Sequence, residues 1–426
     1  MLSKENLPVN LIIGFNLITI FVFSTSPIEW YTDNLYLFYL LSGTCQFLTY
    51  VGYKRGFKNA NRINLKGVPL ALNDKRSVNF IFGFYILTFL LKYAYLLKFK
   101  PYEIIEMVKF LSIGIADPKL GYLLSLDSSR ITVVPWFIYF LISIINQIFF
   151  IVGFFSWKSF SKIKKILFLF LLFIEIYFWM GRGTNFGVIV LITTLILVLL
   201  INLKIRKIKF SFILKYFFII ISLFSLSISF FGNNMAKRSG NQSLNLDAFD
   251  LGNSIVDPNH ISLQVIPEKF HLTYMYVVSY MAQGYYHTCL AFDLEYQPTY
   301  FLANNPGIIS FSDIFGLNFY TDTYVYRLKS KGVDPDINWH SSYTWYASDF
   351  TFLGVPFVFF YLGYFFGYCW NLGHYKGDFL SKILFVIIGN SLIFTFANNN
   401  YLSTVFYTLI ILIPLWYFTR IKKIKI

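Results

Sequence analysis

A glycine-rich turn carries the arginine best suited to binding an anion. It runs from Gly181 to Gly187 with the sequence GRGTNFG, and it joins two apolar segments. Flanking glycines leave the backbone N–H groups and the Arg182 guanidinium able to approach one anion, such as a phosphate. Glu175 lies on nearly the same helix face, about two turns earlier. The alternative is a plain turn whose arginine reaches out to lipid headgroups.

A second polar cluster, from Asn338 to Asp349, lies directly before an apolar segment. Its His340 can exchange a proton near neutral pH and is the first candidate for a base, with Asp349 as the second. A lone histidine can instead be structural, and tryptophan and tyrosine also serve as anchors at a membrane interface. The aromatic residues that could stack on a sugar are Trp339, Tyr343 and Trp345.

Weaker candidates surround these two clusters. Lys237, Arg238 and Arg327 could complete a cationic site for a diphosphate. Asn399, within a turn of three asparagines, could contact a sugar at the rim of the site. The three cysteines give no metal-ligand spacing, and no phosphate-binding loop or GxSxG turn is present. We therefore expect no metal and no cofactor.

The elements that must position these residues are ten apolar segments of membrane-spanning length. The chain is 56% hydrophobic, which is more than the core of a soluble protein requires. Lys92 and Lys215 lie near segment ends, so we expect them to reach the interface, whereas Glu175 should face the protein interior. The segments are roughly 7–25, 35–53, 77–97, 131–155, 163–180, 185–203, 210–231, 350–372, 382–397 and 403–419.

The loops between the segments sort by charge. If both termini are cytoplasmic, the inner side holds 22 Lys/Arg and 3 Asp/Glu, counting lysines at the inner segment ends with their loops. The outer side then holds 12 and 17. This is the positive-inside bias, and it places both polar clusters on the outer face. The net charge of +15 comes from runs beside helix ends, which favours contact with the lipid bilayer and not with nucleic acid.

The outer loops are unequal in length. The first seven spans occupy 1–231, a large outer loop occupies 232–349, and the last three spans with a basic tail occupy 350–426. A loop of that size is usually functional or disordered, and its aromatic content indicates that it folds. Within it, 271–292 is expected to form a helix that lies on or dips into the outer leaflet.

Together these residues resemble the bacterial O-antigen polymerases, which join lipid-linked oligosaccharide repeat units. The likeness rests on the helix count, the dominant late outer loop and two local patterns. One pattern is Gly181-Arg182-Gly183 opening an apolar helix. The other runs from His340-Ser341-Ser342-Tyr343 to Asp349 and Gly354. Many relatives have Ser where Gly181 stands, and a glycine often follows the acid where Thr351 stands.

The resemblance implies an all-α polytopic membrane fold of the GT-C-like glycosyltransferase type, in the bacterial inner (cytoplasmic) membrane with its site facing the periplasm. It implies donor and acceptor glycans on undecaprenyl diphosphate. Arg182 would stabilise the leaving diphosphate, helped by Arg238, Arg327 and Lys237, and His340 or Asp349 would act as base. A chain-length regulator and a flippase are the partners such an enzyme would meet. An O-antigen ligase-like enzyme and a flippase or exporter of lipid-linked oligosaccharide are the alternatives.

Overall fold

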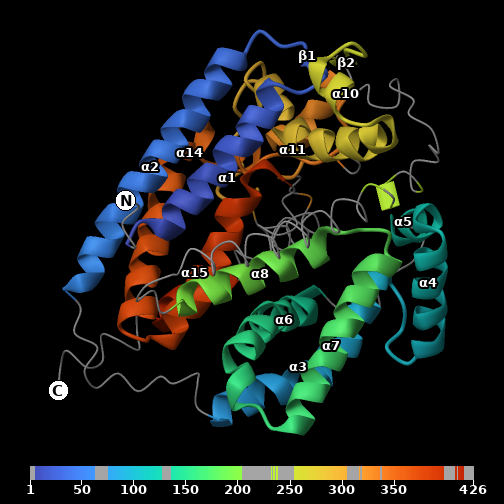
Figure 1. The fold of residues 1–426 in the computed structure, drawn as a ribbon, viewed down its shortest axis with the longest axis vertical. Helices are drawn as coiled ribbons and strands as arrows, with labels where there is room; N and C mark the ends of the chain where they lie inside the picture. Colours follow the sequence, from blue (N-terminus) through green and yellow to red (C-terminus); the bar gives the residue numbers. More distant parts are fainter. Residues whose placement is uncertain are drawn as a thin grey trace.

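The chain is built almost entirely from helices, as a computed structural model reveals (Figure 1). The helices, in chain order, are α1 (Leu7–Ser24), α2 (Leu35–Asn61), α3 (Lys75–Leu97), α4 (Ile104–Ala116), α5 (Pro118–Leu126), α6 (Trp136–Ser156), α7 (Lys162–Gly181), α8 (Phe186–Asn202), α10 (Ile261–Val265), α11 (His271–Ala291), α13 (Tyr324–Arg327), α14 (Ser342–Trp370) and α15 (Phe379–Ile393). Two short strands, β1 (Ile28–Trp30) and β2 (Ser254–Val256), pair antiparallel. The structure describes residues 5–62, 75–126, 136–203, 232, 234–235, 237, 254–304, 316, 319–335, 338–397, 408–409 and 411–416.

Within that part of the chain, five helical stretches are long and apolar enough to cross a membrane. Each overlaps a predicted span, and α2 and α7 cover two further predicted spans as helices. The helix α8 is apolar but shorter. The protein is therefore an all-α, membrane-associated protein, while the count of ten spans stays a prediction. The predicted span 210–231 and most of 403–419 lie outside the described residues. The five stretches are Leu7–Ser24, Arg76–Leu97, Ile142–Ser159, Ser342–Tyr375 and Phe379–Phe396.

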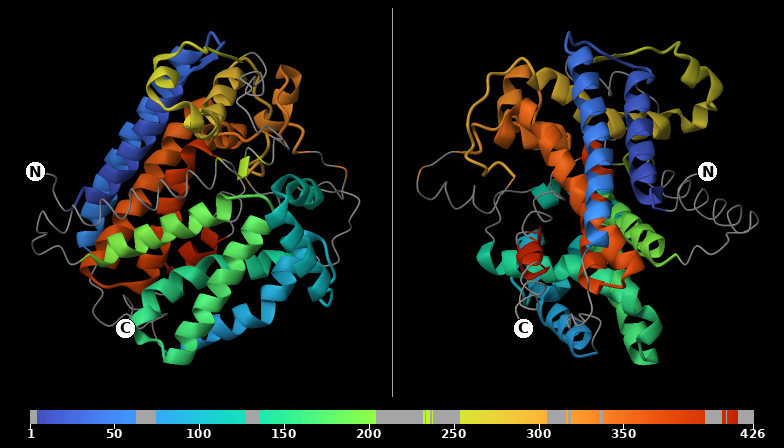
Figure 2. Two further views of the ribbon diagram at one scale, coloured as in Figure 1. Left: turned by 45° about the vertical axis from the view of Figure 1, so that its right-hand side comes forward. Right: turned by 90° about the vertical axis from the view of Figure 1, so that its left-hand side faces the viewer.

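The closest helix pair is α2 with α14, which run parallel and side by side (Figures 1 and 2). Each helix presents two glycines four residues apart. A Cβ atom on Gly52 would overlap the carbonyl oxygen of Phe360, and one on Gly363 would overlap that of Thr49. Gly56 and Gly367 repeat this fit one turn further along. Small residues at this spacing let two helix backbones touch, which is how apolar helices associate without a hydrophobic driving force.

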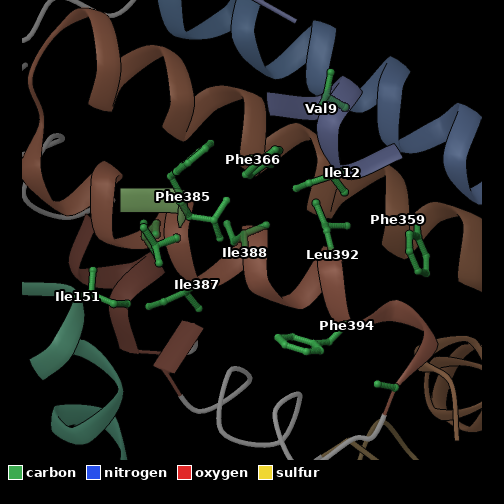
Figure 3. Packing of buried hydrophobic residues seen from close by; sticks show 14 of the residues in the cluster. Val9, Ile12, Ile151, Phe359, Phe366, Phe385, Ile387, Ile388, Leu392 and Phe394 are labelled. Carbon is green, nitrogen blue, oxygen red and sulfur yellow. The ribbon is translucent and has the colours of Figure 1, made fainter. Parts of the chain in front are cut away.

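The helix α15 forms the centre of the bundle. Of the window Phe379–Phe396, 89% is buried, against 33–61% for the other four candidate spans. Phe385 and Ile388 of α15 pack against Phe366 of α14, and α8, α1 and α6 also contact α15 (Figure 3). Its one buried amide, Asn390, donates to the hydroxyl of Thr194 in α8 at 2.8 Å. An apolar helix enclosed in this way fixes the helices around it.

At one end of the bundle, loops distant in sequence join into a cap. β1 lies in the first predicted outer loop and β2 in the large one, with Ile28 opposite Val256. The helix α11 lies across this end (Figure 1), and its Tyr286 ring is 5.0 Å from that of Trp30. The helix expected over 271–292 is thus confirmed, and its position on or in the outer leaflet stays a prediction.

At the other end, the lysine-rich connections contact each other. Lys376, after α14, donates to the carbonyl oxygen of Ala60 at the end of α2 at 2.6 Å. His374 hydrogen-bonds the carbonyl oxygen of Ile201 in α8 at 2.8 Å. Lys164 donates to Asn79, which joins the start of α7 to the start of α3. Connections with the same charge character thus gather at the same end.

Lys92 does not reach the interface as expected. It is 7% exposed and forms an ion pair with Glu175 across α3 and α7, with the Lys92 Nζ 2.5 Å from Oε2. The carboxylate also accepts hydrogen bonds from the hydroxyls of Tyr93 at 2.9 Å and Tyr85 at 3.3 Å. The snorkelling prediction for Lys92 was wrong because a buried carboxylate lay within reach. The expectation that Glu175 faces the interior is confirmed.

Candidate functional site

The polar cluster around His340 begins the helix α14. Ser341 caps this helix: its side chain accepts a hydrogen bond from the N–H of Thr344. A serine at this position satisfies one of the unpaired N–H groups of the first turn. His340 precedes the cap and is 2% exposed, and neither of its ring nitrogens has a hydrogen-bond partner. A buried imidazole with both nitrogens unpaired is costly unless a ligand or water completes it.

The helix α11 supplies the opposite wall of this cluster. The Thr288 hydroxyl is 2.6 Å from that of Ser341 and 3.0 Å from that of Thr344. Gly284, one turn earlier, has no room for a Cβ atom, because the carbonyl oxygen of Phe396 and the backbone N–H of Ser341 lie against it. The close approach of the two backbones depends on this glycine, and it fixes the first turn of α14 against α11.

Sequence reasoning missed His287, the second histidine of the site. Its ring centre is 4.9 Å from that of His340, and its Nδ1 donates to the carbonyl oxygen of Trp339 at 2.8 Å. Burial lowers the pKa of His287 to about 4, and the bond to Trp339 offsets only part of this. Burial, together with His287, holds the pKa of His340 well below its usual range. Both imidazoles are therefore neutral at physiological pH.

These two buried histidines predict loss of stability in acid. Because the pKa is lower in the folded state, the unfolded chain binds the proton first as the pH falls. The free energy of unfolding is therefore highest above about pH 6.5 and decreases towards pH 4. For His287 alone the loss at pH 5 is about 2 kcal/mol. The melting temperature of the purified protein should thus drop between pH 7 and pH 5.

His287→Asn should flatten this pH dependence, because an amide N–H can still donate to Trp339 but does not titrate. His260→Asn is the matched control, since that imidazole is only partly buried and caps α10. An unchanged acid-induced drop in the His287→Asn protein would contradict the assignment.

Asp349 is enclosed by a loop that it holds in place. Its carboxylate accepts from the hydroxyl of Thr299 at 2.5 Å, from the N–H of Ala303 at 2.9 Å and from the side chain of Asn304 at 2.6 Å. Both carboxylate oxygens therefore already accept hydrogen bonds from residues of this loop. We therefore assign Asp349 to positioning the loop 299–304, and His340 remains the candidate base.

The helix α14 is kinked at Thr351, the position at which the sequence departs from the pattern that it resembles. Thr351 has φ 59° and ψ 164°, which interrupts the helix between its first turns and the apolar stretch that follows. Positive φ is costly for a β-branched residue and costs a glycine nothing. The glycine that often follows the acid in the resembling family would fit this conformation without strain. The predicted span 350–372 begins at the same point.

The three aromatic candidates have different surroundings. Tyr343 is fully buried, its hydroxyl accepts from Gln46 at 3.2 Å, and its ring packs on Phe359. That ring has no face open to a sugar, so the prediction of sugar binding is not retained for Tyr343. Trp339 and Trp345 each keep an indole N–H that is buried without a partner. Trp339 is partly exposed and meets the ring of Tyr280 edge to face, so it is the better candidate for a sugar contact.

The Gly181–Gly187 turn differs from the predicted anion loop. The N–H groups of Arg182, Gly183 and Thr184 donate to the carbonyl oxygens of the last turn of α7. They are therefore not available to an anion, and that part of the prediction was wrong. Gly181 and Gly183 instead allow close packing against α4 and α5, where a Cβ atom would overlap Leu111 and the carbonyl oxygen of Pro118. The guanidinium of Arg182 remains the anion-binding candidate.

The structure says less about the other candidate residues for binding the diphosphate or a sugar. Arg327 lies at the end of α13 and donates to the carbonyl oxygen of Glu295. Lys237 is exposed. Arg238 and Asn399 lie outside the described residues. No hydrogen bond or ion pair among the described residues joins Arg327 or Lys237 to Arg182 or His340.

Three contacts link the two polar clusters. Asn185, at the start of α8, accepts from the side chain of Asn234 at 3.0 Å. Next along the chain, the sulfur of Met235 accepts from the Tyr280 hydroxyl at 3.1 Å. Tyr280 in turn packs on Trp339, the neighbour of His340. A continuous set of described residues thus connects the Arg182 turn to the His340 cluster.

Comparison with known proteins adds no assignment: no family model, curated protein or solved structure matches the chain. Within the described ranges, no group of three or more His, Cys, Asp or Glu side chains could hold a metal ion.

Proposed function

We propose that this chain is a glycosyltransferase that polymerises oligosaccharide repeat units carried on undecaprenyl diphosphate, at the outer face of the bacterial cytoplasmic membrane. The observation that carries the proposal is the imidazole of His340, buried and unpartnered at the start of α14. A neutral imidazole offers one N–H donor and one lone pair. It can therefore orient a sugar hydroxyl and take its proton.

The reaction requires a group that accepts the proton of the acceptor hydroxyl and a group that stabilises the negative charge of the leaving group. The acceptor hydroxyl oxygen bonds to the anomeric carbon of the donor glycan while its proton passes to His340. The bond between that carbon and the diphosphate oxygen breaks, and the lipid diphosphate leaves with the electron pair. Arg182 stabilises the negative charge that develops on this leaving group. The proton on His340 then returns to solvent, so the base is ready for the next cycle.

The grouping of the loops supports a site on the outer face. The cap made by β1, β2 and α11 contains the acid-rich loops and His340. The lysine-rich connections contact each other at the opposite end, through Lys376 and Lys164. The positive-inside rule places the lysine-rich end in the cytoplasm. Lipid-linked repeat units are joined outside, so His340 is at the appropriate end for this reaction.

Arg182→Ala should abolish chain extension. In a strain lacking the gene, a gel of surface polysaccharide should show a ladder when the wild-type protein is supplied and a single repeat unit with Arg182→Ala. The guanidinium supplies transition-state stabilisation, and loss of such a group typically costs about 100-fold to 1,000-fold in rate. Arg62→Ala is the matched control, because that exposed arginine lies at the lysine-rich end.

The same gel separates the alternatives. Long chains from Arg182→Ala would remove that residue from the mechanism. Long chains that persist on the carrier lipid in the deletion strain would favour a ligase. Single units retained inside the cell would favour a flippase.

A further inference from the structure

We propose that Trp179 is a positioning residue that holds Arg182 for a diphosphate anion, and that the buried Lys92–Glu175 pair fixes Trp179. The inference rests on the proposed function, because it takes Arg182 as the group that binds the diphosphate. It assigns a purpose to the ion pair, which the reaction itself does not use.

The indole of Trp179 connects the two charged groups. Its Nε1 donates to Oε1 of Glu175 at 2.9 Å. The guanidinium carbon of Arg182 lies 5.5 Å from the centre of the Trp179 ring and 5.6 Å from that of Phe178. A cation within about 6 Å of an aromatic face is attracted to it, and tryptophan gives the strongest attraction. Arg182 thus rests on a ring whose edge is fixed by the carboxylate one turn below.

Gly187 packs against the same indole. A Cβ atom at this position would overlap ring atoms of Trp179, including Nε1. The first turn of α8 therefore packs directly on the ring, which the absence of a side chain permits. This gives a specific reason for the last glycine of the Gly181–Gly187 turn. The ring is held at its edge by hydrogen bonding and at its face by packing.

Charge neutralisation within the pair removes a competing anion from the neighbourhood of Arg182. Lys92 contacts both carboxylate oxygens of Glu175, at 2.7 and 2.5 Å. The pair carries no net charge, so it does not compete with a diphosphate for the guanidinium. A Glu175 without Lys92 would be a buried anion about two turns from Arg182 and would attract the arginine inward. Lys92 is therefore as necessary to the arrangement as Glu175.

Binding of inorganic pyrophosphate to the full-length purified protein tests this inference without a glycan substrate. The readout is the pyrophosphate-dependent rise in melting temperature, converted to an apparent Kd. Trp179→Leu removes the ring and should raise the Kd about 10-fold. Trp179→Phe keeps a ring but loses the N–H to Glu175 and should raise it about 3-fold. Arg182→Ala should abolish the effect.

A matched control is available at the other end of the same helix. Lys165 lies 5.6 Å from the centre of the Trp157 ring, a cation–aromatic contact of the same kind. Trp157→Leu should leave pyrophosphate binding unchanged. If Trp179→Leu yields no folded protein, Trp179→Phe carries the test, because its ring preserves most of the packing.

The outcomes separate this inference from the proposed function. Wild-type pyrophosphate affinity in both Trp179 variants would overturn the positioning role, even if the wild-type protein extends glycan chains. Weakened affinity in these variants, with no chain extension by the wild-type protein, would keep the positioning role and reject the polymerase. For an active polymerase, Trp179→Phe should lower kcat, since Arg182 stabilises the charge that develops on the leaving diphosphate in the transition state.

Discussion

Replacing His340 with alanine is expected to lower the rate of chain extension by at least about 100-fold while leaving the protein folded. The imidazole has two unpartnered nitrogens, so its removal costs no hydrogen bond in the protein. What is lost is the group that orients the acceptor hydroxyl and takes its proton. The measurement is incorporation of lipid-linked repeat units by membrane vesicles that contain the variant.

The pH profile tests whether this base has a lowered pKa. The lowered pKa of His340 keeps the imidazole neutral on acidification, so the rate at pH 6 should stay within about twofold of that at pH 8. A base with an ordinary histidine pKa would lose more than half of its activity over this range. His260→Ala serves as a control that removes a partly exposed histidine from the same loop. Full activity of His340→Ala would end the assignment.

The second large effect is expected on folding. Gly363→Ile should prevent accumulation of folded protein, because its side chain would overlap the backbone of Thr49 in α2. Overpacking alone costs about 1–3 kcal/mol, and here backbone atoms cannot move aside without separating α2 from α14. Total stability is typically about 5–15 kcal/mol, so such a loss is severe. The yield of monodisperse protein from detergent-solubilised membranes measures it.

Gly43→Ile gives the matched comparison on α2. That glycine is exposed and a Cβ atom there meets no neighbouring atom. The same apolar side chain should therefore be tolerated at Gly43. Equal yields of the two isoleucine variants would show that the glycine contact is not needed for folding.

The sequence predicted helices well because hydropathy is a local property. The predicted spans 7–25 and 77–97 match α1 and α3 within two residues at each end. The helix α2 instead continues to Asn61, past the predicted end at 53, since Lys54 and Lys58 are good helix formers that need not lie in the membrane. Polarity marks where an apolar segment stops, and it does not mark where a helix stops.

Partner choice was not predictable, because it joins residues far apart in the chain. Nothing near Lys92 indicates that Glu175, 83 positions later, will pair with it. His287 likewise has no local signature, and only packing of α11 on α14 brings it to His340. The glycine pairs on α2 and α14 were not recognised in the sequence, and small residues at this spacing are compatible with many partners. The sequence suggested the candidate site residues, but the residues that contact them could be identified only from the folded structure.

The pairing of α2 with α14 has a consequence for the living cell. Gly363 is synthesised 311 residues after Gly52. At about 5–20 residues per second, the interval is roughly 15 to 60 s. During that time the glycine face of α2, which the sequence predicts to span the membrane, has no α14 to pack against. The ribosome therefore completes α2 long before α14. Cellular quality control must tolerate a folding intermediate in which α2 lacks this partner.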